Sequence, residues 1–262
     1  MMDLHIVDPR LSLSGLLVGL LVGLTGVGGG AVMTPLLVLV FGIKPATAVG
    51  TDLLYACATK SLGTLVHGLG HTVDWRITRR LAYGSVPGTI LTLLALSRME
   101  LSGAAQGRTI SIILCVMLVI TALALLFRTP LLVVSLRHIE RITPLQEAWL
   151  TVATGLMLGV LVTISSVGAG AIGVTALMLL YPRAKAAVIV GSDIAHAVPL
   201  TLAAGLGHWY LGTIDWGLLG ALLTGSLPGI VIGSALASHA PDVLLRPALA
   251  LVLTFVSVRL AM

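Results

Sequence analysis

The chain has 262 residues, of which 57% are apolar and only 10% are charged, and its formal net charge is +5. A soluble domain usually carries about 25% charged residues, so this composition excludes a globular protein that is surrounded by water. Most Lys and Arg residues lie in short segments between apolar blocks, where positive charge orients membrane proteins. The net charge therefore does not indicate a nucleic-acid partner.

In chain order, the first predicted element is an apolar segment at 11–42, interrupted by the glycine-rich stretch LTGVGGGAVMTP. Later blocks are apolar on every face and have about the 20 residues that a helix needs to cross a bilayer. These blocks lie near 81–97, 109–127, 145–164, 186–206 and 216–238. They lack the alternating pattern of a transmembrane β-barrel. The sequence therefore predicts an all-α polytopic protein of the cytoplasmic membrane, in contact with the lipid bilayer.

An internal repeat divides the chain into two homologous halves. GTDLLYA at 50–56 matches GSDIAHA at 191–197, HGLGHTVDW matches HWYLGTIDW, and GSVPG matches GSLPG, all at one offset of 141 residues. VGGGA at 27–31 pairs with VGAGA at 167–171 at an offset of 140. We predict a first transmembrane repeat at 11–126, a charged linker at 127–147 and a second transmembrane repeat at 148–262.

The relative orientation of the two repeats depends on the glycine-rich segments. If each segment crosses the membrane once, each half has four crossings and the repeats are parallel. If each forms a re-entrant hairpin, each half has three full transmembrane helices and the repeats are inverted. The inverted arrangement gathers nine Lys and Arg residues on one side against five on the other, which agrees better with the positive-inside rule. We therefore favour an inverted repeat, which is common in transporters.

Both glycine breaks are candidate anion sites. A helix interrupted inside a membrane leaves backbone N–H groups free, and the N-terminus of the next helix carries partial positive charge. Glycines let an anion approach those groups, although small residues also simply allow close helix packing. The predicted substrate-binding residues are Gly28, Gly29, Gly30, Thr51, Ser165, Ser166, Gly168, Gly170 and Ser192. Because Gly29 corresponds to Ala169, we expect Gly29→Ala to be the mildest substitution in its run.

Asp52, Lys60 and Asp193 are the charged residues that the sequence places deep within predicted spans. Each costs about 3 kcal/mol at the centre of a membrane helix, so each should face a partner or a wet cavity. They form either a structural ion-pair cluster or a relay for the proton or cation that couples transport to a gradient. Two ionised aspartates would repel an anion, so at least one should be paired with Lys60, protonated or bound to a cation.

Three histidines and three prolines complete the candidate residues. His196 follows Asp193 by three positions and shares its helix face, while His67 and His208 occupy corresponding positions in the two halves. All three are candidates for proton handling, although a His near a helix end often lies at the membrane interface instead. The predicted helix kinks and hinges are Pro87, Pro199 and Pro228.

Ordered motifs over nearly the whole chain carry a family resemblance. They are GLTGVGGGAVMTPLL, PATAVGTDLLYA, GSVPG, VGSDIAHAVPLTLAAGLGH and LLGALLTGSLPGIVIGS. With these motifs the chain resembles the TauE/SafE family, also called the sulfite exporter family. The resemblance implies transport of small anions such as sulfite, sulfoacetate or sulfonates. Many members carry Thr-Ser where this chain has Thr51-Asp52 and Ser192-Asp193, so the resemblance does not identify the substrate.

We therefore predict a secondary transporter that moves a small anion, sulfite or an organosulfur compound, by alternating access between the two repeats. The alternatives are an intramembrane enzyme and a passive anion channel. Ser192 and Asp193 point about 100° apart on a helix, which argues against a catalytic pair. No cofactor or metal is predicted, and Cys57 and Cys115 are interpreted as small buried apolar residues. The sequence leaves the oligomeric state open.

Overall fold

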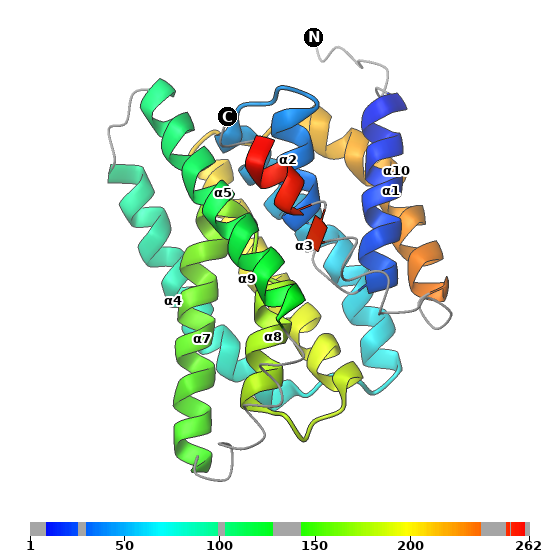
Figure 1. Cartoon of the computed structure of the whole chain (residues 1–262), viewed down its shortest axis with the longest axis vertical. Helices are drawn as coiled ribbons and strands as arrows, with labels where there is room; N and C mark the ends of the chain where they lie inside the picture. The colour runs from blue at the N-terminus through cyan, green and yellow to red at the C-terminus, as the bar shows by residue number, and fades with distance from the viewer. Residues whose placement is uncertain are drawn as a thin grey trace.

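The computed structural model describes residues 9–25, 30–98, 103–127, 143–236, 250–251 and 253–259, and the regular elements within them are α-helices. In chain order these are α1 (Pro9–Thr25), α2 (Gly30–Leu39), α3 (Pro45–Leu69), α4 (Trp75–Arg98), α5 (Gly103–Leu126), α7 (Pro144–Ser165), α8 (Ala171–Leu180), α9 (Ala186–Tyr210) and α10 (Trp216–Leu236). Figure 1 shows them as one bundle. The predicted linker at 127–147 lies largely outside the described residues.

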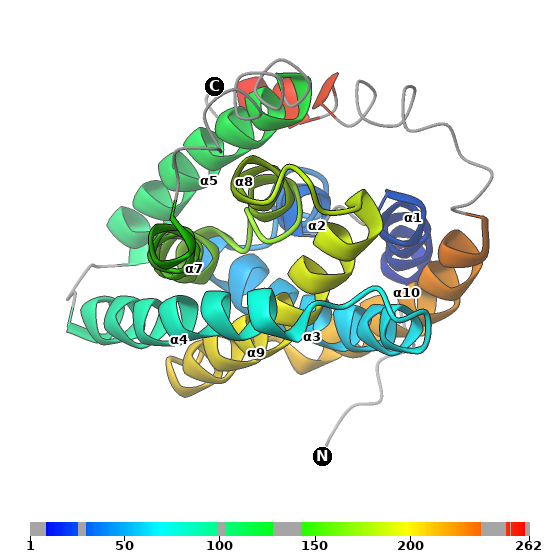
Figure 2. The same ribbon diagram turned by 90° about the horizontal axis from the view of Figure 1, so that it is seen from below.

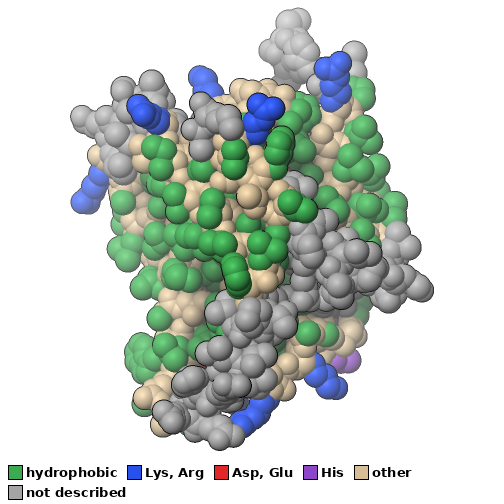
Figure 3. All heavy atoms as spheres, viewed as in Figure 1, with side chains coloured by type: hydrophobic (Ala, Val, Ile, Leu, Met, Phe, Trp, Pro, Cys, Tyr) green, Lys and Arg blue, Asp and Glu red, His purple; other side chains and the backbone are tan. Residues whose placement is uncertain are grey.

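Within the described ranges, four helical segments are long and apolar enough to cross a membrane. They are Arg108–Leu126, Pro144–Ser165, Ala186–Tyr210 and Trp216–Gly233. The helices α3 and α4 are 25 and 24 residues long, but charged residues lower their mean hydropathy. Figure 3 shows hydrophobic side chains across the middle of one face, with Lys and Arg near its two ends. This is the surface of a multi-pass membrane protein.

The helices α1 and α10 pack side by side although about 190 residues separate them in the sequence (Figures 1 and 2). Gly15 and Gly19 of α1 allow this approach, because a Cβ at either position would overlap the carbonyl oxygens of Leu222 and Ser226 in α10. Small residues at membrane helix contacts let two backbones come close enough for extensive van der Waals contact.

The helices α4 and α7 form a second close pair, visible beside one another in Figure 2. A Cβ on Gly155 or Gly159 of α7 would overlap the carbonyl oxygens of Leu81 and Ser85 in α4. Each of these four residues lies 140 or 141 positions from its counterpart in α1 or α10. Between the two pairs, α3 packs against α9.

Two helices occupy each glycine-rich segment. Between α1 and α2, residues 26–29 lie outside the described residues, and the break between α7 and α8 falls at 166–170. In Figure 1, α1 starts at the top of the molecule and α7 starts at the bottom, so they run in opposite directions. The bounds of α8 and α9 lie 141 residues beyond those of α2 and α3.

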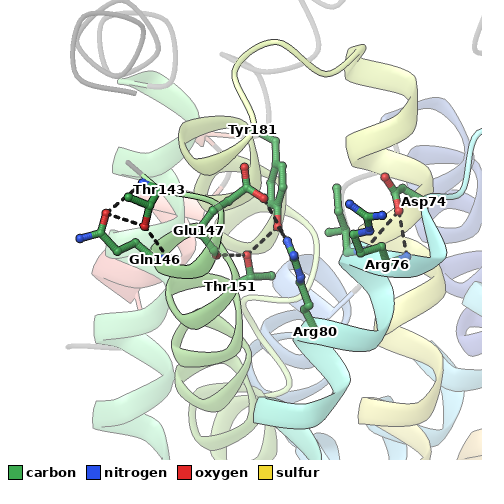
Figure 4. Close-up of polar contacts among 9 residues, drawn as sticks. Asp74, Arg76, Arg80, Thr143, Gln146, Glu147, Thr151 and Tyr181 are labelled. Carbon is green, nitrogen blue, oxygen red and sulfur yellow. Dashed lines mark hydrogen bonds and ion pairs between the residues drawn. The ribbon is translucent and has the colours of Figure 1, made fainter. Parts of the chain in front are cut away.

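Local sequence explains where α7 begins. Thr143 accepts a hydrogen bond from the Gln146 N–H (3.3 Å), and the Gln146 side chain accepts one from the Thr143 N–H (2.9 Å), while Pro144 occupies the first helical position (Figure 4). This is a capping box with a preorganised first turn.

The predicted hinge prolines lie inside helices, with Pro87 in α4, Pro199 in α9 and Pro228 in α10. Each removes a backbone donor from its helix. Their role as hinges stays a prediction.

Candidate functional site

The α7–α8 break, residues 166–170, has a backbone that requires glycine at two positions. Ser166 ends α7 with φ of 58°, and Gly168 and Gly170 have φ of 123° and 126°. Side chains disfavour this left-handed region. Ala169 lies between the two glycines without a positive φ, which explains why a methyl group is accommodated there. The predicted Gly28 and Gly29 lie outside the described residues, and Gly30 is the first residue of α2.

The α7–α8 break is buried, and several of its backbone N–H groups lack acceptors among the described residues. The Gly173 and Val174 N–H groups donate to the carbonyls of Gly168 and Gly170, at 3.1 and 2.9 Å. Within the described part of the chain, the N–H groups of 168–172 make no hydrogen bond, and α8 starts without a side-chain cap. Free N–H groups at a helix N-terminus favour an anion.

The two predicted serines at the break differ in their availability. Ser165 Oγ is engaged by the backbone, since it donates to the Leu161 carbonyl (2.7 Å) and accepts from the Val167 N–H (3.1 Å). Ser166 Oγ is buried and lacks a partner among the described residues. It lies near the Asp52 carboxylate without meeting the geometry of a hydrogen bond. Ser166 is therefore the more available donor of the two.

Lys60 connects α3 to the break. Its side chain is 4% exposed, and Nζ donates to the carbonyl oxygen of Ala169 at 3.0 Å. Lys60 interacts electrostatically with both Asp52 and Asp193, but it forms no ion pair within 4.0 Å with either of them. The predicted cluster of three charges is thus assembled, with the ammonium group bound to the break instead of to a carboxylate.

The two buried aspartates have different surroundings, although both are fully buried. Asp52 Oδ2 accepts a short hydrogen bond from the Thr34 hydroxyl of α2, and its Oδ1 has no partner among the described residues. Neither oxygen of Asp193 has one. A Cβ on Gly173 would overlap Asp193 Oδ1, so this carboxylate lies against the first turn of α8.

The predicted histidines His196 and His208 lie in different environments. His196 Nε2 lies 2.8 Å from Ser85 Oγ of α4, while its Nδ1 is buried without a described partner. His208 uses both ring nitrogens, with Nε2 2.9 Å from the Thr163 carbonyl and Nδ1 2.9 Å from Thr213 Oγ1. His208 therefore holds α9 to its neighbours. The side chain of His67 lies outside the described residues.

Thr51 and Ser192 hold loops in place. Thr51 Oγ1 accepts from the Asp215 N–H just before α10 (3.1 Å), and Ser192 Oγ accepts from the Asp74 N–H just before α4 (2.8 Å). Ser192 Oγ also donates to the carbonyl of Val188. The Thr51 hydroxyl only accepts in this bond and keeps its proton for a substrate, whereas the Ser192 hydroxyl proton is used by Val188. Contact of both residues with a substrate stays a prediction.

Sequence reasoning missed two residues that contact the predicted ones: Thr34 and Ser85. Ser85 lies inside the repeated GSVPG motif, which was a usable signal. Thr34 directly precedes Pro35 and lies at the end of the glycine-rich stretch. No spacing rule links either residue to its partner, because each contact joins two different helices.

A polar cluster joins α4, α7 and the residue after α8 at one end of the bundle (Figure 4). Arg80 Nη1 lies 3.0 Å from Glu147 Oε1 and 3.0 Å from the hydroxyl of Tyr181, which lies 2.8 Å from Thr151 Oγ1. Arg80–Glu147 is the one ion pair found within the described residues. Nearby, Asp74 caps α4 by accepting from the Arg76 N–H at 2.8 Å.

Comparisons with known proteins agree with this architecture. The family model described as "Sulfite exporter TauE/SafE" matches residues 11–260. The "Probable membrane transporter protein YjnA" of Bacillus subtilis (strain 168) is 39% identical over 225 residues, which cover 86% of this chain and 88% of the relative. The "Probable membrane transporter protein YdhB" of the same organism is 25% identical over 236 residues, covering 89% and 91%. No solved structure matches.

Proposed function

The chain belongs to the sulfite exporter TauE/SafE family, so it is a multi-pass membrane transporter and not an enzyme, and we propose that its cargo is a small anion of the sulfite or organosulfonate class. The free N–H groups at the start of α8 carry this proposal. Lys60 adds a positive charge beside them. An oxyanion with several acceptor oxygens matches such a cluster of donors.

We further propose that the two halves form an inverted repeat and that transport proceeds by alternating access, driven by a proton or cation gradient. The opposite directions of α1 and α7 support this proposal. So do the corresponding hydrogen bonds of Thr51 with Asp215 and of Ser192 with Asp74, whose partners are offset by 141 residues. Inverted repeats that meet at broken helices are a recurrent plan for secondary transporters.

Solute counterflow in liposomes that contain the purified full-length chain tests this function. We expect radiolabelled sulfite uptake to saturate and to be accelerated by unlabelled sulfite inside. Lys60→Met should lower this uptake at least tenfold, because the break loses its buried cation; a factor of ten corresponds to about 1.4 kcal/mol. Lys44→Met, which removes an exposed Lys outside the helices, should leave uptake unchanged.

Two results would contradict the proposal. Voltage-driven sulfite current without saturation or counterflow would instead identify a passive channel. If neither sulfite nor a panel of organosulfonates moved, while uncharged or cationic solutes did, the anion specificity would be wrong.

A further inference from the structure

Asp193 is an unusual carboxylate because it is fully buried and neither of its oxygens has a hydrogen-bond partner within the described residues. A buried ionised carboxylate needs a partner or hydrogen-bond donors, since the cost of desolvating the charge is otherwise large. Asp52, the corresponding residue of the first half, has a donor in Thr34. Of the two residues, Asp193 therefore has the surroundings of a carboxyl group that carries a proton.

The groups that face Asp193 are few. Lys60 of α3 is the charged group that acts on it electrostatically, and His196 lies one turn further along α9, with Nδ1 unpartnered. On α8 the described residues include no titratable side chain. The other titratable residues of the helices that pack against α9 are Asp52, Tyr55, Cys57, His67, Arg76, Arg79, Arg80, Tyr83, Arg98 and Glu147, of which the side chain of His67 lies outside the described residues. Among these groups, Asp52 shares with Asp193 the positive charge of Lys60.

The charges of the site do not balance without a further cation. Lys60 supplies one positive charge against the two carboxylates of Asp52 and Asp193, so the fully ionised cluster would repel an anion. Among the described residues, no group of three or more His, Cys, Asp or Glu side chains is arranged to hold a metal ion. A proton needs no such set of ligands, and one proton would make the cluster neutral.

We propose that Asp193 is the proton-binding group of the transporter, and that one proton on its carboxyl group accompanies each anion bound at the α7–α8 break. When Asp193 is protonated, Lys60 stays on the Ala169 carbonyl and the break keeps its positive charge. When the proton leaves, the carboxylate attracts Lys60 away from the break and the anion is released. In the tautomer in which His196 Nε2 donates to Ser85 Oγ, the unpartnered Nδ1 is the next acceptor along the same face of α9. The coupling part of this inference rests on the proposed function.

Infrared titration of the purified full-length chain in lipid nanodiscs tests the proton site without any substrate. Between about pH 5 and 8, the wild-type protein should show the C=O stretch of a buried protonated carboxyl group. Asp193→Asn should remove this band, whereas Asp52→Asn should retain it. Absence of the band in the wild-type protein throughout this range would overturn the proposal, and it requires no variant to fold. Persistence of the band in folded Asp193→Asn would overturn it too.

Proton movement in liposomes then tests the coupling. With methanesulfonate as a permanently ionised probe and a trapped pH dye, an inward anion gradient should acidify the interior in wild-type vesicles. Asp193→Asn should exchange the anion without moving protons, and its affinity should lose the wild-type pH dependence of up to about tenfold per pH unit. Anion flux without the infrared band would refute the proton site and leave the proposed function intact. The infrared band without anion flux would leave the proton site intact and refute the proposed function.

Discussion

Gly168→Ala is the substitution that tests the glycine break most sharply. The nearest atom to a Cβ at this position would be Val162 Cγ2 at 3.5 Å, an ordinary van der Waals distance, so no steric clash is expected. The backbone φ of 123° nevertheless lies where side chains are rarely found. Such strain costs about 1–3 kcal/mol, and if the bound state requires this backbone, the affinity for the anion falls by roughly 5- to 150-fold.

Ala169→Gly is the matched control one residue away. Ala169 has no positive φ, and its methyl group is buried in the apolar core. Removing it should therefore lower stability by about 1–2 kcal/mol, through lost burial and added entropy of the unfolded chain, without straining the break. Dissociation constants for sulfite, measured by ligand-dependent thermal stabilisation of both variants in detergent, compare the two effects. Equal affinities of Gly168→Ala, Ala169→Gly and the wild-type protein would refute the reasoning that the strained glycine backbone forms the anion site.

Three further substitutions test contacts around the site. Gly225→Ala should destabilise the α1–α10 pair by about 1–3 kcal/mol, because its Cβ would overlap the Ser12 carbonyl oxygen. The control is Gly220→Ala in the same helix, whose Cβ would meet no atom within 4 Å and which should not lower the melting temperature. Thr34→Val removes the hydrogen-bond donor to Asp52 and should lower the free energy of unfolding by about 1–3 kcal/mol, measured by thermal unfolding. Thr175→Val is the control and should cost less, because the Thr175 hydroxyl donates only to the Ala171 carbonyl of its own helix. Glu147→Gln should cost no more than about 1 kcal/mol, since the side chains of Arg80 and Glu147 are 21% and 31% exposed; a larger loss would show that the polar cluster holds α4 to α7.

The depth of the charged residues was predictable from the sequence, but their partners were not. Hydropathy alone placed Asp52, Lys60 and Asp193 inside the membrane-spanning bundle, and all three are buried. Lys60 reaches a backbone carbonyl 109 residues away, and backbone carbonyls occur at every position, so no sequence pattern marks the one that a lysine will find. The ion-pair interpretation followed from charge alone, without this acceptor.

The hydrogen-bond partners of the predicted hydroxyl and histidine residues were not predictable either. Thr51 and Ser192 were predicted as substrate ligands, which stays a prediction, but the sequence did not reveal that each accepts a hydrogen bond from a loop N–H. His208 was, like His196, a candidate for proton handling, but contacts with Thr163 and Thr213 engage both of its ring nitrogens. Such differences depend on which helix lies opposite, and spacing along one chain does not reveal that.

The pairing of α1 with α10 has a consequence for how the protein is made. About 190 residues separate the end of α1 from the start of α10, which at ~5–20 residues per second corresponds to roughly 10–40 s of synthesis. Throughout this interval the face of α1 that carries Gly15 and Gly19 lacks its final neighbour. The helix α1 therefore reaches its native contact only after about 190 further residues have been made, and a chain truncated before α10 would leave this face of α1 exposed to quality control.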